Sequence, residues 1–316
     1  MVARTGKGTL IDITHSAPSG PRDVASLQAP LSPADAPPAA AKAISARERQ
    51  RLDWERVAGA VSDFYGAPST QYYRRCEIAL FERSFGTLRG KRLLKLDLWN
   101  EAFNTRILHW ARGQGAEVFG LDLSQVVAAN ARRNGREGGA AGALRVLRAD
   151  IREIPFADDT FDLIYTMGTI EHIDEYAQAV AEIRRVLRPG GRAIIGVPHR
   201  WNLFLRPLMV AMLTACGRYL YAPEKSFGGG ELRRLIESQG LRVTWRSGLL
   251  AAPGFLRMAD LYLFTRENPL WRLSRLWVPL FEFAETRWRW PGRFGYLMAM
   301  LAEKPAACDP AADGRA

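Results

Sequence analysis

In the middle of the chain, short apolar runs alternate with one stretch of helical periodicity. Apolar and β-branched residues at Leu144–Ala149, Phe161–Met167 and Ala193–Val197 predict three strands. Between the second and third of these, apolar residues recur at helical spacing over Ala177–Leu187, which predicts an amphipathic helix. Proline and glycine within Arg188–Gly191 should end that helix and turn the chain into the third strand. A strand, a helix and a strand with short joints predict a parallel crossover of an α/β fold.

The same patterns continue on both sides of this unit. Four further strands are predicted, at Arg92–Leu98, Ala116–Asp122, Gly240–Trp245 and Tyr296–Ala302. Further helices are predicted after a capping Ser45 and at Thr70–Phe85, Asn104–Arg112, Gln125–Arg133, Glu231–Ser238 and Pro269–Arg287. Together these elements predict an α/β fold with a doubly wound, mostly parallel seven-stranded sheet. Helices are expected before the first strand and in an insertion near the C-terminus.

Composition divides the chain into a main part and two tails. The first 45 residues are rich in Ala, Pro and Ser and have no hydrophobic period, so they cannot bury a core. The expected organisation is a disordered tail over residues 1–45, a helical cap over 46–88, a main domain over 89–305 with helical, apolar insertions near 200–220 and 267–290, and a disordered tail over 306–316. No secretory signal is recognisable, and three early aspartates argue against an organellar transit peptide.

Charge and tryptophan are concentrated in the C-terminal third. The net charge is +11, and residues 200–304 hold 16 Lys and Arg, 8 Asp and Glu, and six of the nine tryptophans. Such a surface is typical of arginine-rich solvated faces, of contact with an anionic membrane, or of nucleic-acid binding. The three cysteines lie far apart, which fits a reducing cytoplasm and suggests neither a metal site nor a disulfide framework.

The carboxyl ends of the predicted strands carry the candidate chemistry, because ligands of such sheets bind there. Asp122 ends the second strand, about 20 residues past the first loop, where a carboxylate would hold the two hydroxyls of a ribose. Alternatively it caps the following helix, and the two roles are compatible. Asp150 ends the third strand, and the loop Met167–Glu171 follows the fourth.

These phrases resemble the second half of class I S-adenosylmethionine-dependent methyltransferases. The resemblance rests on Ala149-Asp150-Ile151, Ile154-Pro155-Phe156 with Asp162, Glu171-His172-Ile173-Asp174 and Leu187-Arg188-Pro189-Gly190-Gly191. It covers about residues 92–198 closely and the rest to Pro305 more loosely. It implies the Rossmann-like methyltransferase fold, S-adenosylmethionine as the cofactor, and transfer of its methyl group to an acceptor.

The resemblance also implies roles for individual residues. Asp122 with Leu123 would hold the ribose, and Asp150 with Ile151 the adenine. Asp97 and the backbone of Met167 and Gly168 would hold the methionine end. His172 would accept a proton from an acceptor hydroxyl, or would serve only as structure at the start of a helix.

One part of the family pattern is missing. Members of the family usually carry a glycine-rich loop after the first strand, whereas this chain has Lys95-Leu96-Asp97-Leu98-Trp99-Asn100-Glu101-Ala102. Either the site is dead and the protein is a scaffold, or the loop is rebuilt. In the second interpretation Asp97 and Glu101 supply negative charge to a ligand that carries an ammonium and a sulfonium. The loop resembles a branch of the family that reads Lys-x-Asp-Leu-aromatic-x-Glu-Ala, which favours rebuilding.

The sequence therefore predicts a methyltransferase for a small-molecule or lipid-like acceptor, with a catalytically inactive binding or scaffold protein as the alternative. Nucleic acid is not expected as the acceptor, because no Asp/Asn-Pro-Pro-aromatic phrase follows the fourth strand. An apolar stripe within residues 270–281 lies among arginines and suits core, a homodimer contact or an interfacial helix on an anionic bilayer. We expect a cytoplasmic protein, which under the last of these interpretations would contact the inner face of the membrane peripherally.

Overall fold

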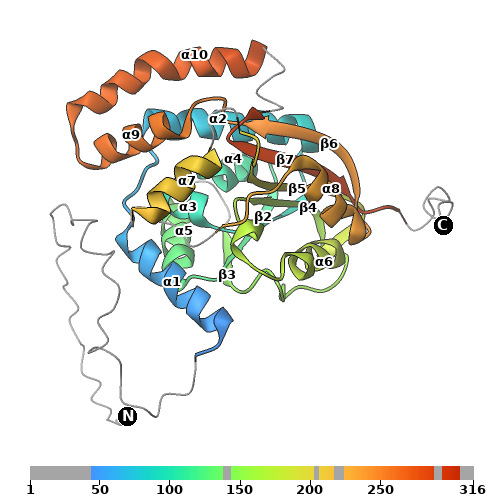
Figure 1. The fold of residues 1–316 in the computed structure, drawn as a ribbon. Coiled ribbons are helices and arrows are strands. Elements are labelled where there is room, and N and C mark those ends of the chain that lie inside the picture. Colours follow the sequence, from blue (N-terminus) through green and yellow to red (C-terminus); the bar gives the residue numbers. More distant parts are fainter. Residues whose placement is uncertain (1–43, 138–143, 203–205, 217–223, 288–293, 307–316) are drawn as a thin grey trace, which may run out of the picture.

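The fold is a single sheet with helices on both faces (Figure 1). The computed structural model describes residues 44–137, 144–202, 206–216, 224–287 and 294–306, so most of the two predicted tails lies outside the described residues. The seven strands lie in the order β3 (Arg145–Arg148), β2 (Glu117–Asp122), β1 (Arg92–Lys95), β4 (Phe161–Met167), β5 (Leu187–Pro198), β7 (Leu297–Glu303) and β6 (Arg242–Leu249). The first five are parallel, and β7 runs antiparallel to both neighbours, which confirms the predicted fold class.

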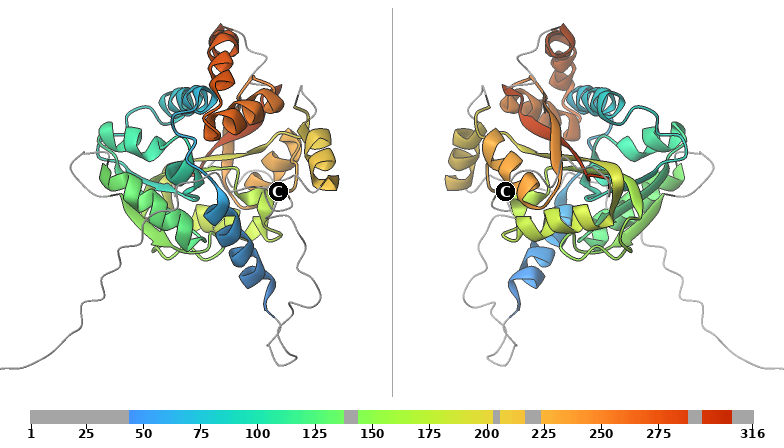
Figure 2. Two further views of the ribbon diagram at one scale, coloured as in Figure 1. Left: turned by 90° about the vertical axis from the view of Figure 1, so that its left-hand side faces the viewer. Right: turned by 90° about the vertical axis from the view of Figure 1, so that its right-hand side faces the viewer.

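The helices divide between the two faces of this sheet. In chain order they are α1 (Ala46–Ala60), α2 (Pro68–Phe85), α3 (Trp99–Phe103), α4 (Ile107–Gly113), α5 (Gln125–Glu137), α6 (Tyr176–Val186), α7 (Arg206–Ala215), α8 (Gly229–Ser238), α9 (Gly254–Thr265) and α10 (Ser274–Arg287), with short 3-10 turns η3 (Ile170–His172) and η4 (Pro269–Leu273). Helices α2, α4 and α5 pack on one face and α6 and α8 on the other. Helices α9 and α10 lie outside α2 (Figures 1 and 2).

Alternation along the strands explains why both faces are covered. In β1, Leu93 contributes to the core beneath α2 and Leu94 to the core beneath α6, and both are fully buried. Leu163 and Ile164 of β4 divide in the same way. Successive side chains of a strand point to opposite faces, so a strand buried on both sides has a continuous apolar run. That is why these strands are recognisable in the sequence.

Two local predictions were wrong, and one helix was missed. The predicted helix Asn104–Arg112 begins only at Ile107, as α4, and a separate short helix α3 ends before it at Phe103, because Asn104 is irregular and Arg106 has a φ of 52°. The predicted turn Arg188–Gly191 belongs to β5 as an irregular segment, in which the N–H of Gly190 donates to the carbonyl of Lys304. Helix α9 was not predicted at all. In contrast, Ser45 caps α1 as expected, since its hydroxyl accepts from the N–H of Glu48 at 3.2 Å.

Candidate cofactor and acceptor site

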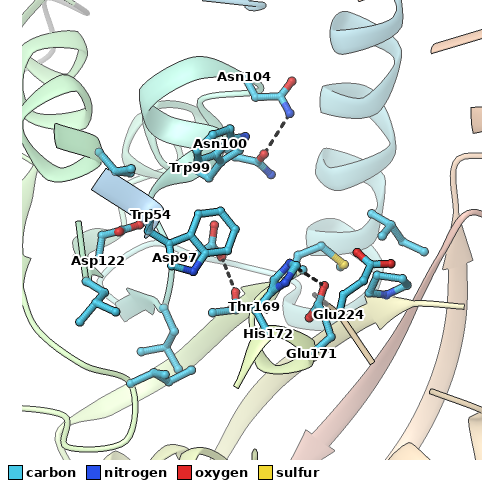
Figure 3. Close-up of a pocket in the computed structure, with 18 of the residues that line it drawn as sticks. Trp54, Asp97, Trp99, Asn100, Asn104, Asp122, Thr169, Glu171, His172 and Glu224 are labelled. Carbon is cyan, nitrogen blue, oxygen red and sulfur yellow. Dashed lines mark hydrogen bonds and ion pairs between the residues drawn. The ribbon is translucent and has the colours of Figure 1, made fainter. Parts of the chain in front are cut away.

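A cavity of about 240 Å³ opens at the carboxyl ends of the parallel strands (Figure 3). Its walls come from the segments that follow β1 to β4, from α1 and α2, and at its far end from α7 and α9. It brings together most of the residues singled out in the sequence, namely Asp97, Asp122, Leu123, Asp150, Ile151, Met167, Gly168 and His172. Glu101 is the one predicted site residue that does not line it.

Asp122 lies at the tip of β2, where its two carboxylate oxygens face different backbone amides. Oδ2 accepts from the N–H of Leu98 and Oδ1 from the N–H of Ser124, both at 2.8 Å. Burial raises the pKa of Asp122 to about 7, although the two N–H donors act in the opposite direction. Ser124 is the residue that caps α5, because its hydroxyl accepts from the N–H of Val127 at 3.2 Å. Each oxygen of Asp122 keeps a further lone pair for a ligand hydroxyl.

Asp150 and Ile151 line the cavity after β3, next to an arginine that the sequence did not single out. The guanidinium of Arg152 contacts the Asp150 carboxylate at 2.6 Å and that of Glu175 at 2.8 Å, with only 3% of its side chain exposed. Burial alone would raise the pKa of Asp150, but the hydrogen bonds with Arg152 lower it by more. The pKa of Asp150 is therefore below its usual value. Asp150 is thus a fixed carboxylate beside an apolar wall, as an adenine amine and ring require.

The segment after β1 is built around a buried lysine rather than glycines. Lys95 is fully buried, and its Nζ donates to the carbonyl of Asp97 at 2.6 Å and to its carboxylate at 3.0 Å. Burial alone would lower the pKa of Lys95, but the carboxylates of Asp97, Glu101 and Glu77 more than offset this effect. The pKa of Lys95 is therefore above its usual value. The other oxygen of Asp97 accepts from the hydroxyl of Thr169 at 3.2 Å. These partners fix an acidic side chain at the cavity wall.

Glu101 has a different place from the one predicted. Its carboxylate is fully buried and accepts from the N–H of Leu108 in the first turn of α4, at 3.2 Å to each oxygen. Burial raises its pKa to about 7. The structure therefore does not bring Glu101 to the ligand, and its contacts assign it to the junction of α3 and α4. The second carboxylate that a rebuilt loop was expected to offer is missing from the cavity wall.

The loop after β4 carries the remaining predicted residues. Gly168 has a φ of 82°, which favours glycine, and its N–H already donates to the carbonyl of Gly196 at 2.9 Å. The amide of Gly168 thus serves the sheet rather than a ligand. His172 ends the short turn η3, and its ring lies edge-on to Trp54 with 5.1 Å between the ring centroids. The structure leaves both of its predicted roles, proton acceptor and structural element, open.

Helix α1 covers the part of the cavity that lies between His172 and the start of α5. No sequence motif indicated the contacts that hold it there. Glu55 accepts from the hydroxyl of Ser124 at 2.8 Å and from the amides of Gln125 and Val126 at 2.7 and 3.0 Å, so it satisfies the first donors of α5. Gln50 donates to the carbonyl of His172 at 2.6 Å. Because these contacts reach across more than 65 residues, periodicity in α1 could not reveal them.

The far end of the cavity holds a group of buried charges. Glu171 of η3 and the ion pair Arg206–Glu224 all line it, with side-chain exposures of 1%, 6% and 4%. Figure 3 shows Glu171 and Glu224 on the same side of the cavity as His172. Only Glu171 had a signal in the sequence, as the neighbour of His172 in the Glu-His phrase. Arg206 and Glu224 flank an apolar segment with no recognisable motif.

Comparisons with known proteins agree with this geometry. A sequence model of the family described as "Methyltransferase domain" matches residues 101–195. A ubiquinone/menaquinone biosynthesis C-methyltransferase of Geobacter sulfurreducens is 29% identical over 221 residues, covering 60% of this chain and 82% of the relative. These matches support a class I S-adenosylmethionine-dependent methyltransferase. S-adenosylmethionine is accordingly the cofactor that this family implies for the cavity.

Other relatives show how far the likeness extends. A demethylmenaquinone methyltransferase of Bacillus velezensis is 32% identical over 84 residues, which are 27% of this chain and 36% of the relative. A methyltransferase structure in complex with the Haloferax volcanii Trm112 activator has a TM-score of 0.53 at 17% identity, covering 84% of this chain and 100% of that chain, which shows the fold alone. The chain spans only 23% and 36% of the length of the first curated relatives that it matches.

The chemistry of the cavity suits this methyl donor. Asp122 offers free lone pairs to the cavity, and Asp150 with Ile151 offers an acceptor beside an apolar contact. Asp97 places a carboxylate on the cavity wall, and Lys95 donates to Asp97 and does not line the cavity. The missing glycines therefore leave a cradle that still favours a cation.

Proposed function

We propose that the protein transfers a methyl group from S-adenosylmethionine to a small, lipid-like acceptor. When bound, the cofactor supplies a methyl group on a sulfonium, which is already a reactive electrophile. The protein then mainly orients the donor and the acceptor and excludes water. The observation that carries the proposal is the continuity of one cavity, which runs from the carboxylates at the strand ends to apolar side chains of α9.

The apolar end of the cavity reaches the surface. Met258 and Leu261 of α9 line it, together with Leu250 and Leu297. Met258 is also 43% exposed, so it lies where the cavity meets solvent. An acceptor with an apolar tail would find its complement at this end. The names of the relatives support such an acceptor, since they refer to demethylmenaquinone, ubiquinone and menaquinone, and tocopherol.

We further propose that the helices around this opening rest on an anionic membrane. Their exposed apolar side chains form what we call the outer face, made up of Leu208, Met212, Phe255, Met258, Tyr262, Leu270, Leu273, Leu276, Leu280 and Phe283. These residues belong to α7, α9, η4 and α10, which are neighbouring elements (Figures 1 and 2). Within α9 to α10 four arginines are exposed (Arg266, Arg272, Arg275 and Arg287) against one exposed acid, Glu267. Apolar side chains beside cations suit an interfacial position.

The outer face differs in detail from the predicted stripe. Trp271, Trp277 and Phe281 are half-buried and pack inward, whereas the leucines between them are exposed. Trp288 and Trp290 lie outside the described residues. Within the described residues, no helix combines the length and the apolar character that crossing a bilayer requires. The proposal is therefore contact with the membrane surface.

Two measurements test the proposed function. In the first, the protein is incubated with S-adenosylmethionine that carries a labelled methyl group and with a bacterial lipid extract that contains reduced quinones. The label should appear in a product that partitions into organic solvent. Titration calorimetry with S-adenosylhomocysteine should show binding. A folded protein that releases no heat at millimolar ligand would instead be the inactive scaffold, an alternative that the comparisons do not support.

A further inference from the structure

One buried carboxyl group on the cavity wall has an oxygen that is left without a hydrogen-bond partner among the described residues. The side chain of Glu171 is 1% exposed, and its Oε2 has no hydrogen-bond partner among the described residues. Its Oε1 lies 3.9 Å from Nε2 of His172, which is beyond hydrogen-bond distance. Leaving a buried polar atom unsatisfied costs about 1–3 kcal/mol. Proteins keep such groups mainly where a ligand or a reaction needs them.

The nearby arginine compensates this carboxyl group only in part. Arg206 forms a two-pronged ion pair with Glu224, in which one of its nitrogens lies 2.9 Å from a carboxylate oxygen. Arg206 therefore lies near two carboxyl groups, and its charge is shared between Glu224 and Glu171. Burial raises the pKa of Glu171 well above its usual range, and Glu224 adds to this effect. A carboxyl group in this position loses its proton less readily than one in water, so this wall is less hostile to an apolar acceptor.

Its position within the cavity is what makes this group useful. Glu171 follows Gly168 and Thr169 on the loop after β4, and Thr169 contacts Asp97 at the expected methionine end. Glu224 lies beside Glu171 in Figure 3, and Arg206 of α7 forms an ion pair with Glu224. Glu171 therefore lines the same cavity as Asp97 at the expected methionine end and as Met258 and Leu261 of α9. An acceptor that enters from α9 would bring its reacting atom past this side chain.

We infer that Glu171 is the catalytic acid–base residue, which takes a proton from the hydroxyl or activated C–H of the acceptor. This inference rests on the proposed function. In the step, the acceptor oxygen or carbon forms a bond to the methyl carbon, and sulfur keeps the electron pair of the broken methyl–sulfur bond. Glu171 first loses its own proton to solvent, its carboxylate then takes the acceptor proton, and that proton leaves to solvent before the next turnover. Arg206 and Glu224 are positioning residues that keep the wall dry and electrically balanced.

The test compares Glu171→Gln with Glu117→Gln, a matched change on an exposed β2 carboxylate that pairs with Arg145. Turnover with a reduced naphthoquinone, menadiol, and with the lipid extract should fall about 10²–10⁴-fold in the first variant and stay unchanged in the second. Affinity for S-adenosylhomocysteine should be equal in both. Wild-type kcat/KM should rise with pH above the ordinary carboxyl range, and this rise should disappear in Glu171→Gln.

Other charged groups face Glu171, so the pH profile needs its own control. These are His172 on the same loop, Asp97, Arg206 and Glu224. His172→Gln should keep the rise of kcat/KM with pH. If the rise disappears there and persists in Glu171→Gln, His172 is the base and the assignment of Glu171 is overturned. Equal turnover of Glu171→Gln and wild type would overturn it as well.

An infrared measurement separates this inference from the proposed function. A pH titration of the wild type should show a protonated carboxyl band that is absent from Glu171→Gln, disappears as the pH rises, and shifts when menadiol is added in the presence of S-adenosylhomocysteine. If the wild type methylates no acceptor, the proposed function fails and the infrared result still decides the placement of Glu171. A missing band, or one that menadiol leaves unmoved, would overturn the inference.

Discussion

The two ends of the cavity are built by different means. At the cofactor end, carboxylates at strand ends are held by the backbone, as Asp122 is by the amides of Leu98 and Ser124. At the acceptor end, the walls are side chains of α7 and α9, and the same helices expose Leu208, Met212, Phe255 and Tyr262 to solvent. The first end is fixed by the sheet. The second depends on how helices pack against one another and on what covers them.

This difference shows where specificity for each ligand comes from. Parallel strands end at one edge, so a ligand that binds there meets the same type of acidic residue in many sequences. An acceptor pocket made by inserted helices has no such constraint and can change with the substrate. We therefore expect changes at the outer face to affect membrane contact without affecting cofactor binding, and changes at the strand ends to do the reverse.

The largest expected effect concerns the outer face. Replacing both Leu276 and Leu280 of α10 with Asp should abolish sedimentation with vesicles that contain anionic lipid, because burying each leucine contributes roughly 1.5–3 kcal/mol. Both side chains are about 70% exposed (71% and 69%), so folding should survive. Leu52→Asp on α1, 43% exposed, is the matched control and should still bind. Half-buried Trp277→Ala should lower stability more than vesicle binding.

Two other outcomes of the vesicle experiment would assign a different role to the outer face. Wild-type binding should weaken as salt rises, at about 1 kcal/mol for each surface cation that loses its lipid partner. If wild type ignores anionic vesicles at low salt but forms dimers that the double variant cannot form, the outer face is a subunit contact. If it does neither, a soluble acceptor becomes the better proposal.

The next effect concerns the ribose. Asp122→Ala should weaken binding of S-adenosylhomocysteine by roughly 1.5–3 kcal/mol, the range for a hydrogen bond to a charged group. The same change leaves the amides of Leu98 and Ser124 unpartnered, so a control on the ligand is needed. Wild type should prefer S-adenosylhomocysteine over its 2′-deoxy analogue, and Asp122→Ala should bind the two equally. An unchanged preference would place the ribose elsewhere.

The sequence predicted the cofactor end better than the acceptor end for a physical reason. Strands buried on both faces give long apolar runs, and Asp122 lies at the end of such a strand, β2. Asp150 follows the edge strand β3, whose Val146 and Leu147 are only half-buried, and is recognised from the family phrase around it. Glu101 could not be placed, because α3 begins just after β1 and rotates that side chain toward α4, which depends on the break at Asn104. Arg206, Glu224 and Glu55 act through partners far away in sequence, and no local pattern encodes such pairs.

A smaller effect is the pH dependence of cofactor binding. The pKa of Asp122 is raised to about 7, and the ribose hydroxyls need its charged form. Below pH 7 the free protein must therefore lose a proton to bind, which costs about 1.4 kcal/mol for each pH unit. Affinity for S-adenosylhomocysteine should fall up to about tenfold per unit below pH 7 and level off above it. Asp122→Asn should remove this slope, whereas Glu101→Gln, away from the cavity, should keep it.

The smallest expected effect tests the loop that lacks glycines. Asp97→Asn keeps the shape of the side chain and acceptors for Lys95 but removes the negative charge, so S-adenosylmethionine should bind about 1 kcal/mol more weakly, within the range of a hydrogen bond. Folding should be unaffected, because the Asp97 carbonyl still accepts from Lys95 at 2.6 Å. Methylthioadenosine, which lacks the ammonium and the sulfonium charge, should bind both proteins equally well.

The reverse change tests the same loop from the other side. Glycines at positions 97, 99 and 101 would recreate the usual family loop, but they would also remove the charge partner of Lys95 and the acceptor that Glu101 offers to Leu108. A fully buried lysine without its carboxylate is strongly destabilising. We expect the triple variant to unfold at a lower temperature and to bind S-adenosylhomocysteine no better than wild type. Tighter binding or faster turnover in that variant would mean that the loop is a decayed glycine loop. The buried Lys95–Asp97 pair would then be a substitute that costs activity, rather than the element that holds the cation site in place.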